Sequence, residues 1–167
     1  MKKKSSNIKI EIRDQEKIYN DFDRSKLSDE LGRYIYNQRS LYNINQKVGI
    51  DILLFDDIST YEELELQRMI HKYFKNKVKE MTQIEKQDTI KKILLFLIGT
   101  IIIFLSHNIH FKNDFIVTEI LLIIGWVAIW EVFDIVLFRE TKRKFKLNIY
   151  KKLSTCKINI DSNVITK

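Results

Sequence analysis

Two apolar stretches lie close together in this chain: ILLFLIGTIIIFLS at residues 93–106 and FIVTEILLIIGWVAIWEVFDIVLF at residues 115–138. A helix that crosses the hydrocarbon of a bilayer needs about 20 mostly apolar residues. The second stretch is long enough by itself. The first becomes long enough when its flanking residues are included, because the stems of Lys91 and Lys92 can extend toward the headgroups. The sequence therefore predicts a hairpin of two transmembrane helices that span about 91–108 and 115–138.

Charge is segregated along the chain, whose net charge is +7. Lysine and arginine minus aspartate and glutamate give +3 for residues 1–92, −3 for 93–138 and +7 for 139–167. Because basic residues favour the cytoplasmic side of a membrane, we expect both termini in the cytoplasm and a short loop of roughly 107–114 outside. Basic residues beside a span also contact anionic lipid, and we prefer this interpretation to a nucleic-acid surface. The predicted membrane-surface residues are Lys91, Lys92, Arg139, Lys142, Arg143, Lys144 and Lys146.

Long helices are expected on both sides of the hairpin, because the chain contains no proline. Ser59 and Thr60 each stand three residues before a glutamate, which is the capping-box pattern of a helix start. An apolar stripe follows at spacings of three and four, so we expect one helix from Thr60 to Leu105. The stripe consists of Leu66, Ile70, Tyr73, Phe74, Val78, Met81 and Ile84. The second span is expected to continue to about Ser154, with Phe138, Phe145, Ile149 and Leu153 on one stripe.

Outside the hairpin, alternating apolar residues predict three strands, at residues 8–12, 48–55 and 157–161. Ser28 can cap a helix between the first two strands, and Leu31, Tyr34, Ile35, Gln38 and Tyr42 would share one side of that helix. We therefore expect a membrane α+β protein. A small cytoplasmic α/β or ferredoxin-like domain with a juxtamembrane helix occupies 1–89, the hairpin occupies 90–138, and a basic helix with a strand that joins the N-terminal sheet occupies 139–167.

The second apolar stretch carries an unusual polar face. On a helical wheel Glu119, Trp126, Trp130 and Asp134 share one side, with Glu131 beside Asp134. An acidic residue at mid-membrane costs roughly 2.5 to 3.5 kcal/mol, so these groups should face a partner helix, another subunit or water. Three interpretations stay open. The carboxylates form an ion pair with Lys91 or Lys92 that fixes helix register, they line a conducting or protonation-sensing path, or they are tolerated near the end of the hairpin.

Small residues in both spans indicate close helix packing. Gly99 with Thr100, and Gly125 beside Trp126, lie near the middle of the two stretches. Small side chains let helix backbones approach, either within the hairpin or between subunits. Trp126 lies far from the interfacial belt in which tryptophan is common, so we expect it to pack against another helix. A homo-oligomer is the resulting expectation.

Catalytic and metal-binding patterns are weak. The three histidines include His107 and His110 in the predicted outside loop, where Asp114 is the nearest carboxylate, and solvated side chains explain them better than a metal site. Asp56-Asp57 after the second predicted strand is better explained by a turn than by function. Cys156 is the only cysteine, which fits a reducing cytoplasm. We expect no enzyme activity, no cofactor and no metal.

Several segments resemble a group of small uncharacterised bacterial membrane proteins with two transmembrane helices. The similar segments are Leu27–Ile35, Gly125–Glu131, Tyr150–Leu153 and Lys157–Ile160. The resemblance implies a bacterial inner-membrane location and brings no catalytic or ligand residue with it.

Two classes of function follow as hypotheses. The first is a non-enzymatic interaction or sensing protein, anchored in the bacterial inner membrane, whose cytoplasmic domain binds a protein or a small ligand. The second is a channel or membrane-perturbing effector, for example in anti-phage defence, with a path lined by Glu119 and Glu131 and gated by the cytoplasmic domain.

Overall fold

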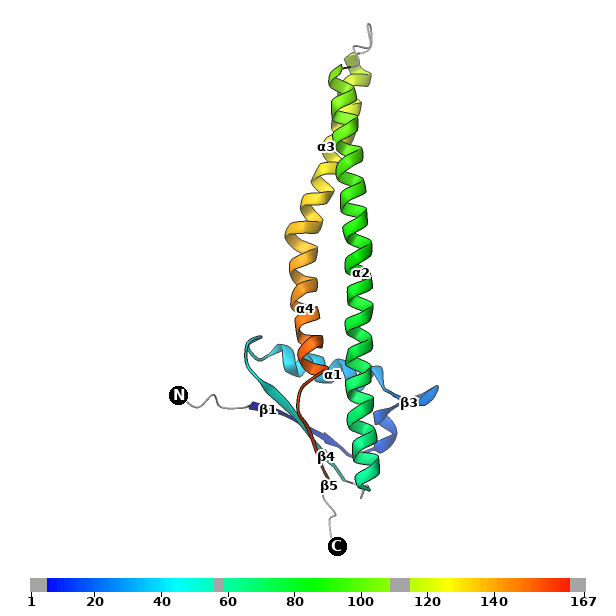
Figure 1. The fold of residues 1–167 in the computed structure, drawn as a ribbon, viewed down its shortest axis with the longest axis vertical. Coiled ribbons are helices and arrows are strands. Elements are labelled where there is room, and N and C mark those ends of the chain that lie inside the picture. Colours follow the sequence, from blue (N-terminus) through cyan, green and yellow to red (C-terminus); the bar gives the residue numbers. More distant parts are fainter. Residues whose placement is uncertain (1–5, 56–58, 109–114, 163–167) are drawn as a thin grey trace. The chain divides into compact units, whose positions relative to one another are not determined.

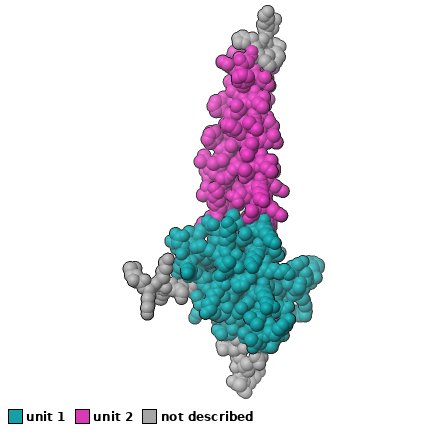
Figure 2. Space-filling model, in the orientation of Figure 1, with its two compact units in different colours: residues 1–79, 146–167 teal, residues 80–145 magenta. Residues whose placement is uncertain are grey.

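The structure, a computed structural model, describes residues 6–55, 59–108 and 115–162 of the chain. They divide into two compact units, residues 1–79 with 146–167 (unit 1) and residues 80–145 (unit 2), which Figure 2 distinguishes by colour. The elements in chain order are β1 (Ser6–Ile12), η1 (Gln15–Ile18), β2 (Tyr19–Asn20), β3 (Asp23–Leu27), α1 (Asp29–Ser40), β4 (Val48–Leu54), α2 (Thr60–Asn108), α3 (Phe115–Asp134), η2 (Ile135–Arg139), α4 (Glu140–Leu153) and β5 (Ile158–Ser162).

Unit 1 is built on a three-stranded sheet in the order β1-β4-β5, and both strand pairings are parallel. Ile8 lies opposite Ile50, which in turn lies opposite Ile158, so one face of the sheet is a layer of buried isoleucine. The three predicted strands and the return of the last strand to the N-terminal sheet are confirmed. Figure 1 shows β4 between β1 and β5.

The expected ferredoxin-like arrangement is wrong, because that fold has the order β-α-β-β-α-β with four strands, whereas the described sheet has three, all parallel. The reason lies in the connections. Helix α1 stands between β1 and β4, and helical segments stand between β4 and β5, so each connection is a crossover of the kind that parallel strands require. A short antiparallel hairpin, β2-β3, was not predicted.

Two predicted helix caps are confirmed in unit 1. The side chain of Ser28 accepts a hydrogen bond from the backbone N–H of Leu31 at 3.2 Å and starts α1. Ser59 and Glu62 form a reciprocal capping box at the start of α2, where the N–H of each residue donates to the side chain of the other. The helices then cover the isoleucine face of the sheet. Their buried apolar residues are Leu31, Ile35, Leu66, Met69, Ile70, Phe74, Leu147, Ile149, Tyr150 and Leu153.

Unit 2 contains the apolar parts of α2 and α3, which pack together around two glycines. A Cβ atom on Gly99 would lie 3.0 Å from the carbonyl oxygen of Gly125, and one on Gly125 would lie 2.5 Å from Cγ1 of Ile103. A side chain at Gly125 would force Ile103 to shift, and one at Gly99 would press against α3, which confirms close packing within the hairpin. Both helices are long and apolar enough to cross a membrane, and only 11% of the most apolar stretch of each is buried.

The helix that begins at Phe115 continues to Leu153 through a π-helical turn, η2. Its last bond runs from the N–H of Glu140 to the carbonyl of Ile135, five residues back. This continuation to about Ser154 is confirmed, as is the uninterrupted helix from Thr60, which ends at Asn108. Of the four residues on the predicted apolar stripe, Ile149 and Leu153 are buried, whereas Phe138 and Phe145 are exposed.

Candidate functional site: a charged layer in unit 2

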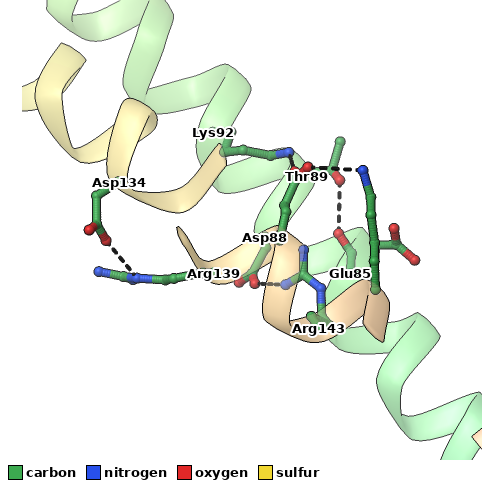
Figure 3. A network of polar contacts seen from close by, with 9 residues as sticks. Glu85, Asp88, Thr89, Lys92, Asp134, Arg139 and Arg143 are labelled. Carbon is green, nitrogen blue, oxygen red and sulfur yellow. Dashed lines mark hydrogen bonds and ion pairs between the residues drawn. The ribbon is translucent and has the colours of Figure 1, made fainter. Parts of the chain in front are cut away.

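Eight charged side chains from two antiparallel helical segments gather in unit 2, and we refer to them as the charged layer. They form five ion pairs, and Figure 3 shows most of them. Four are cations and four are carboxylates, so the charged layer has no net formal charge. Its members are Asp88 and Lys92 on α2, Glu131 and Asp134 on α3, Arg139 on η2, and Glu140, Arg143 and Lys144 on α4.

The inner part of the charged layer joins α2 to α4. Lys92 forms an ion pair with Glu140, and both side chains are largely buried. Glu140 also accepts from Lys144 at 3.4 Å, one helical turn further along α4. Arg143 forms an ion pair with Asp88 and keeps only 9% of its side chain exposed. These two cross-helix pairs fix the register of α2 against α4, because sliding either helix by one turn would leave buried charges unpaired.

Arg143 holds unused hydrogen-bonding capacity. Its Nη1 atom bonds to Asp88, whereas its buried Nε and Nη2 atoms have no hydrogen-bond partner among the described residues. Buried donors without partners cost about 1–3 kcal/mol each, and more on a charged group. The contact with Asp88 is therefore the main interaction that offsets the cost of burying the Arg143 guanidinium, and the stability of this pair of helices depends on it.

The outer part of the charged layer depends on the π-helical turn. Arg139 bonds through Nη2 to Glu131 at 2.9 Å and through Nε to Asp134, also at 2.9 Å. Asp134 and Arg139 are five residues apart, a spacing that places side chains on different sides of an α-helix but on the same side of a π turn. The turn therefore creates this pair, and π turns of this kind are frequent at functional sites.

The acidic residues found by sequence do not all lie together. Glu131 and Asp134 belong to the charged layer, but they contact Arg139 and not Lys91 or Lys92, so the expected partner is wrong. The physical reason is that Lys92 is held by Glu140, while the π turn brings Arg139 back over both carboxylates. Glu119 lies outside the layer, near the start of α3, and is exposed.

The two tryptophans on the same side of α3 as Glu119 do not pack inside the described chain. Trp126 is 59% exposed and Trp130 is 74% exposed. Within the described chain Trp126 does not pack against another helix, because Gly125 and not Trp126 meets α2. Its packing against a helix of a second subunit stays a prediction. These rings lie on the apolar outer surface of the hairpin.

The basic residues predicted for a membrane surface have three different environments. Lys92, Arg139, Arg143 and Lys144 belong to the charged layer, while Lys91 and Lys142 are exposed. Lys146 lies in unit 1, where its Nζ atom is 5.8 Å from the ring centroid of Tyr36 and 6.0 Å from that of Tyr150. His110, Asp114 and the Asp56-Asp57 pair lie outside the described residues.

Arg39 in unit 1 was missed by sequence reasoning, although it is 1% exposed. Its guanidinium donates four hydrogen bonds of 3.0–3.3 Å to backbone carbonyls in the segment after α1, and burial lowers its pKa. An arginine at a helix end followed by polar residues was the available signal, because such a side chain often bonds the free carbonyls there. Burial likewise raises the pKa of the Cys156 thiol to about 11, so this thiol is protonated at neutral pH.

The fold and the charged layer define an α+β protein with two packed helices that are long and apolar enough to cross a membrane. No protein-family model, curated protein or solved structure matches the chain.

Proposed function

We propose that this chain is a non-enzymatic interaction or sensing protein, anchored in the bacterial inner membrane by the hairpin of α2 and α3, with both termini in the cytoplasm. Unit 1 is the part that binds a protein or a small ligand, and the protein acts as a homo-oligomer. The resemblance to small bacterial proteins with two membrane spans supports the location.

One observation carries the proposal: the apolar stretches of α2 and α3 are only 11% buried. A helix that belongs to the core of a soluble domain would bury such a surface, because about 25 cal/mol is gained for each Å² of apolar area removed from water. Lipid chains supply the missing cover. Two spans also return the chain to the side from which it entered, so residues before α2 and after α4 share one compartment.

The charged layer supports the same arrangement. Charged side chains are costly in lipid unless they are paired, and this layer is neutral overall and paired throughout. It lies toward the ends of the apolar stretches that basic residues mark as cytoplasmic. We propose that it fixes helix register at the membrane boundary, so that a change in unit 1 can pass along α2 and α4.

Single-cysteine labelling tests the topology. In a Cys156→Ser background, His107→Cys places a thiol at an exposed position before the loop, and Thr155→Cys places one at an exposed position after α4. A membrane-impermeant maleimide should label the first variant in intact spheroplasts and the second only after lysis. Labelling of both variants before lysis, or recovery of the chain in the soluble fraction without detergent, would contradict the proposal.

Glu119 favours the second function, a channel or membrane-perturbing effector. It lies in the apolar stretch, is exposed, and forms no ion pair with any part of the chain that the structure describes. A carboxylate in that position gains most from a second copy or from a water-filled path. The arrangement of several copies would place these carboxylates at one depth, where they could line such a path.

Permeability measurements separate the two functions. Induced expression of an effector should depolarise the membrane or admit dye, and Glu119→Ala should remove the effect while Glu65→Ala, an exposed acidic position in unit 1, should retain it. Glu131→Ala should affect permeability differently from Glu119→Ala, because the carboxylate of Glu131 forms an ion pair with Arg139. Unchanged permeability with the wild-type chain, even when the neighbouring genes are present, would exclude the effector function and leave the anchored interaction protein.

A further inference from the structure

A hollow of about 560 Å³ opens on unit 1 at the beginnings of β4 and β5. Its volume falls in the range of roughly 300–1,000 Å³ that is typical of small-molecule sites. The residues that line it come from β1, the end of α1, β4, the end of α4, β5 and the segments that precede β4 and β5. They are Asn7, Arg39, Gln46, Lys47, Val48, Gly49, Lys152, Thr155, Cys156, Lys157 and Asn159.

Gly49 is part of the lining of this hollow. A Cβ atom at this position would lie 2.9 Å from Oδ1 of Asn7 and 3.2 Å from the carbonyl oxygen of Lys157, so a side chain here would have to displace its neighbours. On the same face of the sheet, Asp51 accepts hydrogen bonds from the amides of Asn7 and Asn159 at 2.7–3.0 Å. The carboxylate of Asp51 is therefore held by two amides and is not part of the lining.

The lining has an unbalanced charge, with four cations and no carboxylate. Arg39 is fully buried, and its guanidinium donates to four neutral backbone carbonyls. Lys152 similarly donates to the carbonyl of Ile44. These two side chains contribute positive charge to the hollow, although their donors are occupied. Buried charge without a counter-ion is unfavourable, and an anion in the hollow would relieve it.

Two further lysines supply the donors. Lys47 and Lys157 are exposed, and neither forms an ion pair with the described residues. They directly precede the adjacent parallel strands β4 and β5, and both line the hollow. Lysine binds phosphate as a point charge, and several lysines around one site favour an anion that carries more than one negative charge.

We propose that this hollow binds a phosphate-containing anion through Lys47 and Lys157, which line it. This inference names a ligand class for the sensing role proposed above and rests on that proposed function. The phosphate group could belong to a soluble molecule or to a lipid headgroup, and the chemistry at the two lysines is the same for both.

Lysine footprinting on the full chain tests the proposal. Amine acylation is measured by mass spectrometry at Lys47 and Lys157, with Lys72 and Lys75, both exposed on α2, as internal controls. One arm adds pyrophosphate to protein in neutral detergent. The other compares nanodiscs of phosphatidylcholine with nanodiscs that also contain phosphatidylglycerol. Protection of Lys47 and Lys157, but not of the controls, supports the site, and the arm that gives it identifies a soluble or a lipid source.

Substitution provides a second measurement. Lys47→Gln with Lys157→Gln should weaken pyrophosphate binding, measured calorimetrically at constant ionic strength, by about 100-fold, or about tenfold for each lost charge-assisted contact. Lys72→Gln with Lys75→Gln should leave binding unchanged. Equal protection at all four lysines, no protection in either arm, or equal weakening by both double variants would overturn the site. The pyrophosphate arm and the two double variants do not depend on membrane location, so the site and the proposed membrane anchoring can fail separately.

Discussion

Removing the Asp88 carboxylate should destabilise the hairpin more than removing the arginine that it binds. In Asp88→Ala, the guanidinium of Arg143 stays in place with 9% of its side chain exposed and loses the partner of Nη1, while Nε and Nη2 already have none among the described residues. Breaking one partner of a buried pair costs about 3–5 kcal/mol. Because Asp88 is itself 27% exposed, water reaches part of this site, and we expect about 2–4 kcal/mol.

The reverse substitution should cost less. In Arg143→Met, the apolar stem is largely kept and the partially exposed carboxylate of Asp88 can be hydrated, so we expect about 1–2 kcal/mol. Arg24→Met in unit 1 is the control, since Arg24 and its partner Glu16 are 81% and 82% exposed, and pairs of exposed side chains contribute about 0–1 kcal/mol.

The free energy of unfolding can be measured by titrating SDS into mixed micelles and following tryptophan fluorescence. The order of destabilisation should be Asp88→Ala, then Arg143→Met, then Arg24→Met. A cost of less than about 0.5 kcal/mol for Asp88→Ala, or a larger cost for Arg143→Met, would contradict this role of the buried pair.

Three further changes test other parts of the structure. Gly125→Ala should destabilise the helix crossing by about 1–3 kcal/mol in the same SDS titration, because its Cβ would lie 2.5 Å from Ile103, and a neutral or stabilising effect would contradict the packing. Arg39→Met should cost about 3 kcal/mol in chemical denaturation, with little rescue by Arg39→Lys, since a lysine cannot serve four carbonyls; an equally stable Lys variant would argue against the role of the fork. Alkylation of Cys156 at pH 8 should be about 100-fold slower than that of a thiol with pKa 9, and should keep rising with pH toward its pKa of about 11, whereas rapid labelling at pH 8 would show that the thiol is not buried.

Much of the fold could be predicted because its signals are local. Ser28 and the Ser59–Glu62 pair are caps whose hydrogen bonds lie within one turn, and the isoleucines at 8, 10 and 12 alternate in the period of a strand. The hairpin β2-β3 was missed because Tyr19–Asn20 is too short to show alternation. Strand order and direction depend on contacts between distant segments, which no local pattern contains.

The charged layer could be predicted only in its composition. Glu131, Asp134 and Arg139 are visible in the sequence, but their pairing depends on a π turn, which shifts the helical phase by about one residue. A wheel that assumes 100° per residue cannot bring residues five apart together. The burial of Arg39 could not be predicted either. A sequence pattern places a charged side chain on the surface, whereas here four backbone carbonyls accept hydrogen bonds from the buried guanidinium.

The exposure of Trp126 and Trp130, the only tryptophans of the chain, allows the most direct test of whether lipid covers the hairpin. The full chain would be reconstituted in vesicles whose acyl chains carry bromine, and tryptophan fluorescence compared with that in unbrominated vesicles and with aqueous acrylamide. If lipid covers the hairpin, the brominated chains should quench the tryptophan fluorescence strongly and acrylamide should quench it weakly. Strong quenching by acrylamide with none by brominated lipid would show that these rings lie in water, and would contradict the membrane hairpin.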